Sequence, residues 1–381
     1  AQTFPAGAAP IPLPNSPVVQ LPGASPAQGK VVEGLKALNA GDLAAAEAAF
    51  TEAARVDPKL SGAYIGLAEV AGRQDKPARV EYWLKQALTA DPNSAMMQRV
   101  WGRHQFQRGR FVEAEAALKK AIALDPRSSD AQLNLAENYL FGLKKAKPAE
   151  AAYRAAIALD AGSAQAHLGL AATLGALGQP DAALAEYEQA AKLAPADPKF
   201  THALARFQAS QGRFDQALVA QQKTIAIAPD FFPAYIDLGD LYLVKNDLEQ
   251  AAAAYRAGAK VTKNPATALF KLGTVLEGQQ RWAEAEQAYL DAVKSDPTMY
   301  SAYNNLAFMA AVRKERLDDA LAWAKKAVEL APKVTTTQDT LGWVYRARGE
   351  LGPAAQALEK AVAANPKKAS FRYHLGVVYA E

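Results

Sequence analysis

The chain has 381 residues, half of them hydrophobic, and its 43 basic and 39 acidic residues leave a net charge of +4. Such a small excess does not predict nucleic-acid binding, and no apolar run reaches the roughly 18 residues that a membrane-spanning helix needs. The chain has no cysteine, which excludes disulfides, thiolate metal sites and cysteine nucleophiles.

Residues 1–29 contain seven prolines and no charged side chain. Because proline fixes φ and interrupts helices, this stretch is predicted to be an extended N-terminal segment. It is interpreted either as a spacer or as a docking segment, and we favour docking to a partner chain. The apolar side chains expected to enter shallow pockets are Ile11, Leu13, Val18 and Leu21.

The chain begins with Ala1-Gln2 and not with Met. Because signal peptides are removed after small residues, we expect a mature, exported bacterial protein with a periplasmic or extracellular location. A trimmed sequence and a cytoplasmic location are the alternatives.

A two-helix pattern then recurs ten times, and residues 266–299 carry a clear copy of it. The turn is expected at Gly278–Arg281, and the second helix is expected to end at Asp296-Pro297. Each helix has an apolar stripe at helical spacing. The two stripes consist of Leu269, Leu272, Gly273 and Leu276, and of Ala285, Tyr289 and Ala292.

Small residues recur in phase with this pattern, once in each first helix and twice in each second helix. The spacing is 34 residues, except for two intervals of 35. Small side chains allow the two helix axes to approach closely while larger neighbours fill the gaps. Since one pair cannot bury its own apolar faces, the pairs must stack on one another.

These columns divide the chain into the extended segment 1–29 and a repeat domain over 30–381. The repeats are placed at 27–60, 61–94, 95–128, 129–163, 164–197, 198–231, 232–265, 266–299, 300–334 and 335–368, with a partial repeat at 369–381.

The fourth and ninth repeats are one residue longer than the others. The extra residue is expected in the turn between the two helices, near Leu143–Lys147 and near Arg313–Arg316. The partial repeat restarts a first helix with Leu375-Gly376 and Tyr379. Because solenoids need capped ends, this half repeat predicts a truncated chain or a longer native protein.

The pattern resembles the tetratricopeptide repeat, W-x2-L-G-x2-Y…A-x3-F…P, with its 34-residue period. Residues 335–368 carry Leu341-Gly342, Tyr345, Ala354 and Pro366, and the resemblance covers about 340 of the 381 residues. It implies an all-α fold, a right-handed α-solenoid of about ten helix pairs plus a C-terminal half repeat.

In this family the first helices line a concave groove, so the resemblance implies a set of partner-binding residues. They are Arg99, Arg103, Phe106, Glu137, Phe141, Asp240, Phe270, Asn304, Phe308, Asp339, Trp343, Arg346 and Tyr373, with Leu140, Ile236, Leu243 and Val244 at equivalent positions. Arg99 and Arg103 beside aromatic residues would grip an acidic peptide or an anionic glycan. The alternative is an ordinary solvated helix face.

The sequence lacks the motifs GxxxxGK[ST], GxGxxG, HExxH and GxSxG. We therefore expect no enzymatic activity, no cofactor and no metal. The predicted function is a protein–protein interaction scaffold, or an assembly subunit of a multi-protein envelope complex, with other protein chains as partners. The alternatives are an accessory component of a polysaccharide or protein export system, and the recognition arm of an enzyme whose catalytic domain lies beyond residue 381.

Overall fold

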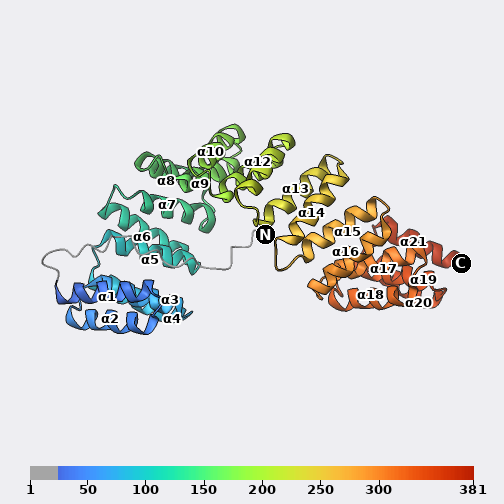
Figure 1. Ribbon diagram of the computed structural model, residues 1–381, viewed down its shortest axis with the longest axis horizontal. Helices are drawn as coiled ribbons and strands as arrows, with labels where there is room; N and C mark the ends of the chain where they lie inside the picture. Colours follow the sequence, from blue (N-terminus) through green and yellow to red (C-terminus); the bar gives the residue numbers. More distant parts are fainter. Residues whose placement is uncertain (1–24) are drawn as a thin grey trace. The chain divides into compact units, whose positions relative to one another are not determined.

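The computed structural model describes residues 25–381, and all of their regular secondary structure is helical (Figure 1). The predicted all-α fold of stacked helix pairs is therefore confirmed. Within this range, no helix combines the length and apolarity needed to cross a membrane. The proposed docking residues of the N-terminal segment lie outside the described residues. They are Ile11, Leu13, Val18 and Leu21.

The chain forms two compact units, unit 1 (Ala1–Ala194) and unit 2 (Pro195–Glu381). The first helices of unit 1 are α1 (Pro26–Asn39), α3 (Ser61–Arg73), α5 (Ala95–Gln107), α7 (Ser129–Glu137) and α9 (Ala164–Ala176). Its second helices are α2 (Leu43–Val56), α4 (Pro77–Ala90), α6 (Phe111–Leu124), α8 (Ala146–Leu159) and α10 (Pro180–Leu193). A π-helix, η1 (Asn138–Gly142), continues α7.

Unit 2 repeats the same arrangement and adds one further first helix. Its first helices are α11 (Pro198–Ser210), α13 (Phe232–Val244), α15 (Ala266–Gly278), α17 (Tyr300–Arg313), α19 (Thr335–Ala347) and α21 (Ala369–Ala380). Its second helices are α12 (Phe214–Ile227), α14 (Leu248–Lys260), α16 (Trp282–Ser295), α18 (Leu317–Leu330) and α20 (Leu351–Ala364).

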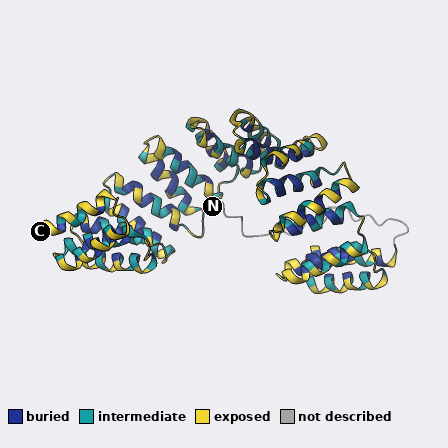
Figure 2. Ribbon diagram, turned by 180° about the vertical axis from the view of Figure 1, so that it is seen from behind, coloured by how far each residue is buried: buried dark blue, intermediate teal, exposed yellow. Residues whose placement is uncertain are grey.

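The small residues lie where the helices of a pair meet, and Figure 2 shows the buried residues along these facing surfaces. Ala251 and Ala285 are fully buried, as predicted. A Cβ atom added at Gly273 would lie 2.6 Å from the ring of Tyr289. Glycine therefore lets the aromatic ring of the second helix pack directly on the backbone of the first helix.

From α3 onward, the first helix of each full 34-residue repeat has 13 residues, and a three-residue turn follows it. In the fourth repeat, α7 and η1 together have 14 residues, and the turn before α8 still has three. In the ninth repeat α17 also has 14 residues. The prediction that the extra residue lies in the turn is therefore wrong, because the first helix contains it in both repeats.

The two long repeats accommodate this residue differently. In η1 the amide of Leu143 donates to the carbonyl of Asn138 at 2.9 Å, which widens one helical turn. The buried Asn138 side chain in turn donates to the carbonyl of Phe111 at 2.9 Å, which anchors this turn on α6. The turn of the ninth repeat has left-handed backbone at two residues, Lys314 and Arg316, whereas that of the fourth repeat has it at Lys144.

Helix α1 begins at Pro26, so residues 26–29 are helical and the extended segment cannot reach residue 29. Proline is compatible with the first helical position because that residue's N–H has no helical partner. The Ser25 hydroxyl accepts from the amide of Gln28, while the Gln28 side chain accepts from the amide of Ser25. This reciprocal pair starts the helix earlier than the proline content predicts.

Candidate peptide-binding site

The predicted basic positions of unit 1 already have neighbours of their own. Arg99 Nη1 lies 3.5 Å from the carboxylate of Asp130. Arg103 is half-buried on the same helix, α5. Phe106 packs against Phe111, with 5.7 Å between ring centroids. The two arginines therefore form a basic surface on α5, and Arg99 has a long contact with Asp130.

The other predicted residues of unit 1 lie at the C-terminal end of the α7–η1 helix. The Gln165 amide donates to the carboxylate of Glu137 at 3.5 Å, which is a long contact. Phe141 is exposed on η1. Leu140 beside it is half-buried.

In the middle of unit 2, the predicted residues pack partly into the helix pairs. The Phe270 ring lies 5.8 Å from the ring of Tyr289. Asn304 and Phe308 are half-buried on α17. The side-chain oxygen of Asn304 is buried, and no donor to it is found among the described residues. These residues present a mixed apolar and amide surface.

Near the C-terminal end, the structure brings four predicted residues together on α19 and α21. Asp339 is buried and lies 2.9 Å from Nδ1 of His374. The rings of Trp343 and His374 stack with centroids 4.2 Å apart, and the guanidinium of Arg346 lies 4.5 Å from the Trp343 ring. Tyr373 packs beside His374 on α21.

Arg346 also donates from Nε to the Glu381 carboxylate at 3.0 Å. The members of this C-terminal cluster thus satisfy one another, which favours a role in holding α21 against α19. The cluster consists of Asp339, Trp343, Arg346, Tyr373, His374 and Glu381.

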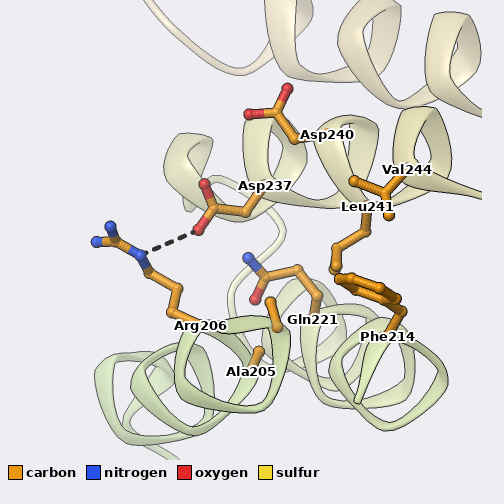
Figure 3. A pocket seen from close by; sticks show the side chains of 9 residues that line it. Ala205, Arg206, Phe214, Gln221, Asp237, Asp240, Leu241 and Val244 are labelled. Atoms are coloured by element: carbon orange, nitrogen blue, oxygen red, sulfur yellow. Dashed lines mark ion pairs between the residues drawn. The ribbon is translucent and has the colours of Figure 1, made fainter. Parts of the chain in front are cut away.

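A cavity of about 290 Å³ lies between α11, α12 and α13, entirely within unit 2 (Figure 3). Two of its lining residues, Asp240 and Val244, are among the residues that the family resemblance places in the groove. Arg206 lies one 34-residue period before Asp240 and therefore occupies an equivalent position. The complete lining is Ala205, Arg206, Ala209, Phe214, Gln221, Asp237, Asp240, Leu241 and Val244.

The polar end of the cavity is centred on Asp237. Nε of Arg206 lies 3.6 Å from its Oδ2, and Nε2 of His202 lies 3.7 Å from the same oxygen (Figure 3 shows the Arg206 contact). Both distances exceed hydrogen-bond length. Burial raises the pKa of Asp237, and the charges of His202 and Arg206 only partly offset this effect.

Asp240 is held more firmly than Asp237. It accepts a hydrogen bond from the hydroxyl of Tyr255, and Nζ of Lys271 lies 2.7 Å from its Oδ1. Burial, together with this carboxylate, raises the pKa of Tyr255. Helices α14 and α15 therefore fix Asp240, whereas the nitrogens of Arg206 and His202 stay beyond hydrogen-bond length from Asp237.

The opposite end of the cavity is apolar. Phe214, Leu241 and Val244 come together there, as Figure 3 shows. Val244 is 59% exposed, so the apolar end reaches the protein surface. Exposed apolar surface beside polar groups is typical of ligand sites.

At this pair a glutamine stands in the column that holds a tyrosine in the next pair. Gln221 lies one period before Tyr255, whose ring packs on Gly239 in the next pair. Gln221 is fully buried and its side-chain amide bonds to Nδ1 of His202. A glutamine is slimmer than a tyrosine ring, so space remains beside Ala205.

Comparison with known proteins assigns the family. A family model described as "Tetratricopeptide repeat" matches residues 31–95, 99–164, 236–300, 270–334 and 340–381. A second model with the same description matches residues 174–223. Together these matches cover more than half of the chain. The chain belongs to the tetratricopeptide repeat family.

Three curated relatives match parts of this repeat protein. Protein O-mannosyl-transferase Tmtc1 of Drosophila melanogaster is 33% identical over 26% of the chain and 12% of the relative. The chloroplastic protein PYG7 of Arabidopsis thaliana is 28% identical over 32% of the chain and 42% of the relative. Human tetratricopeptide repeat protein 6 is 26% identical over 51% of the chain and 37% of the relative. The chain thus spans less than half the length of each of these relatives.

Solved structures support the fold. A tetratricopeptide repeat protein from Parabacteroides merdae is 17% identical, with a TM-score of 0.51 over 66% of this chain and 98% of that one. The C-terminal part of a repeat protein from Cytophaga hutchinsonii is 15% identical, with a TM-score of 0.52 over 64% and 99%. PilW, a type IV pilus biogenesis factor, is 22% identical, with a TM-score of 0.50 over 54% and 96%.

Sequence reasoning missed Asp237 and Arg206. Asp237 occupies the sixth position of its repeat, which the family resemblance does not assign to the groove. The available signal was chemical, since the same position holds no charged residue in unit 1, where it is Val32, Gly66, Val100, Asn134 and Gly169. Across residues 25–381, no group of three His, Cys, Asp or Glu side chains is arranged to hold a metal ion.

Proposed function

We propose that this tetratricopeptide repeat protein is a non-enzymatic scaffold that holds extended segments of partner proteins along the first helices of unit 2. The observation that carries the proposal is the cavity between α11, α12 and α13, which joins an apolar wall to the poorly paired carboxylate of Asp237. Ligand sites of proteins combine these two features.

The first helices offer an extended segment a surface of suitable length. Neighbouring packed helices lie roughly 8–10 Å apart, so the first helices of unit 2 present a path of about 40–50 Å. An extended chain rises about 3.3 Å per residue, so the path would hold roughly 12–15 residues. Phe270 and Phe308 lie on this path beyond the cavity.

We also propose that the scaffold serves in a multi-protein assembly of the cell envelope. The family fold supports protein binding in general. The neighbouring pilus biogenesis factor resembles the chain only at the level of the fold. Bacterial origin, export and a role in polysaccharide or protein secretion stay predictions of the sequence.

A second candidate is the recognition arm of an enzyme. It is favoured by the relative that is named a transferase, of which this chain spans 12%. The gene sequence after the codon for Glu381 separates the candidates, because a catalytic domain encoded there would favour the second.

Site-specific photo-crosslinking in the native host tests the scaffold proposal. A benzophenone amino acid replaces Phe270 or Phe308 on the first helices, and Val219 or Val112 on second helices serves as the control. Both control side chains are well exposed. We expect discrete protein adducts from the first-helix positions only. Adducts confined to the second-helix positions would contradict the proposal.

A further inference from the structure

The Asp237 carboxylate lacks the close donors that a partly buried anion requires. Its side chain is only 32% exposed, yet the nearest nitrogens of Arg206 and His202 stand 3.6 and 3.7 Å from Oδ2. A carboxylate removed from water is costly unless charged donors bond to it. By comparison, Oδ1 of Asp240, three residues later, accepts from the Tyr255 hydroxyl and from Nζ of Lys271.

The geometry leaves room for another donor at this carboxylate. The cavity of about 290 Å³ opens between Asp237 and the apolar wall formed by Phe214, Leu241 and Val244. A guest that reaches Asp237 along this wall needs an apolar stem and a cationic end. Lysine and arginine side chains have this construction, since their methylene stems pack on apolar surface while the charge stays at the tip.

Arg206 does not close the site against such a guest. Its side chain is 70% exposed, and its Nε is too distant to donate a hydrogen bond to Asp237. Exposed ion pairs of this kind contribute little to stability. The guanidinium is therefore free to turn into solvent when another cation approaches.

We infer that the cavity between α11, α12 and α13 receives a lysine or arginine side chain of a partner protein segment, with Asp237 as the acceptor of its charged end. The inference rests on the proposed scaffold function and names the chemistry of the segment. Phe214, Leu241 and Val244 hold the stem.

Methyl NMR on the full chain tests this inference. The probe is Nα-acetyl-lysine N-methylamide, and the comparison compound is the norleucine analogue, which has the stem without the ammonium. We expect the lysine compound to shift the methyl signals of Leu241 and Val244. The norleucine analogue should bind about tenfold more weakly or not at all, because it cannot donate to Asp237.

Two variants assign the effect to the cavity. Asp237→Asn should weaken binding of the lysine compound about tenfold. Arg206→Ala should strengthen it, because a competing cation is removed. The matched control is Asp130→Asn in unit 1, where the carboxylate is 66% exposed and pairs with Arg99. This control should leave lysine binding unchanged.

Equal binding of the norleucine analogue would overturn the inference and identify an apolar pocket. Unchanged affinity in both cavity variants, or no shift at Leu241 and Val244, would overturn it as well. If lysine binding fails while Phe270 and Phe308 still form crosslinks, only the inference fails. If the crosslinks fail while lysine binds, the scaffold proposal fails and the cavity binds lysine for another purpose.

Discussion

Units 1 and 2 share the columns that build the helix pairs and differ at a neighbouring column. The sixth position of the repeat is mostly small or apolar in unit 1 and mostly polar in unit 2. In unit 1 it holds Val32, Gly66, Val100, Asn134 and Gly169. In unit 2 it holds Ala203, Asp237, Lys271, Asn305, Thr340 and His374.

The cation–π contacts follow the same division. Every cation–π contact found within residues 25–381 lies in unit 2, with examples at Arg346–Trp343 and Lys271–Tyr255. Conversely, a serine side chain caps the N-terminus of four of the five first helices of unit 1. Among the first helices of unit 2, one has a side-chain cap, which is Asp197 at α11. The comparison teaches that the repeat fold tolerates variation at this column, and that Asp237, which lines the cavity of unit 2, lies in it.

The largest expected effect tests whether the shared columns carry similar stability in both units. Tyr289→Ala and Phe50→Ala each remove a fully buried ring that packs on glycine, and should each lower the free energy of unfolding by about 3–5 kcal/mol. The separate variant Tyr289→Phe should lower the free energy of unfolding by about 1 kcal/mol, because it loses the hydroxyl that donates to Glu277 at 2.7 Å. Urea denaturation measures all three, and unchanged midpoints would contradict the packing scheme.

Overpacking the small column is expected to have the next largest effect. Ala285→Leu in unit 2 and Ala114→Leu in unit 1 add bulk at fully buried positions, which should cost about 1–3 kcal/mol. Limited proteolysis should locate the damage in the unit that carries the change. Wild-type resistance in both variants would show that the pairs have spare volume.

The difference in helix capping can be tested in both directions. Ser128→Ala removes the hydroxyl that accepts from the amide of Ala131, and should destabilise unit 1 by about 1 kcal/mol. Val334 precedes α19 without a capping side chain, so Val334→Ser should stabilise unit 2 by a similar or smaller amount. Hydrogen exchange at the starts of α7 and α19 would report both effects. A loss of protection at the start of α19 in Val334→Ser would contradict this account.

Smaller effects of opposite sign are expected from pH. Hydrogen bonds from Arg110 and Lys85 lower the pKa of Glu81 to about 2. The stability from this carboxylate is therefore present above its ordinary pKa and lost as the pH falls toward about 2.

Burial raises the pKa of Asp237 in unit 2, among His202, Arg206, Asp240 and Lys271. Its charged form disfavours folding, so this cost is relieved as the pH falls through the raised pKa. Thermal unfolding of Glu81→Gln and Asp237→Asn against pH should show the two opposite differences from the wild type. Differences of the same sign would contradict the assignment.

The sequence predicts the helix pairs because each small column must be buried at one fixed phase. The position of the extra residue of the fourth repeat could not be predicted in this way, since it depends on the bond from Asn138 to Phe111, which joins separate helices. The groove residues were only partly predictable. Asp339 and Trp343 occupy expected positions but are satisfied within the C-terminal cluster. Asp237 was missed because its candidacy as a binding residue rests on the long distances to Arg206 and His202, which its position in the repeat does not reveal.

Affinity selection of random twelve-residue peptides on the full chain tests the central claim, that partner segments bind at the unit 2 cavity. The claim predicts that recovered peptides share a lysine or arginine, lose binding to Asp237→Asn, and still bind a variant with Arg99 and Arg103 both changed to Glu. Recovery of acidic peptides that tolerate Asp237→Asn and fail on the double variant would contradict it, and would place binding on the basic surface of unit 1.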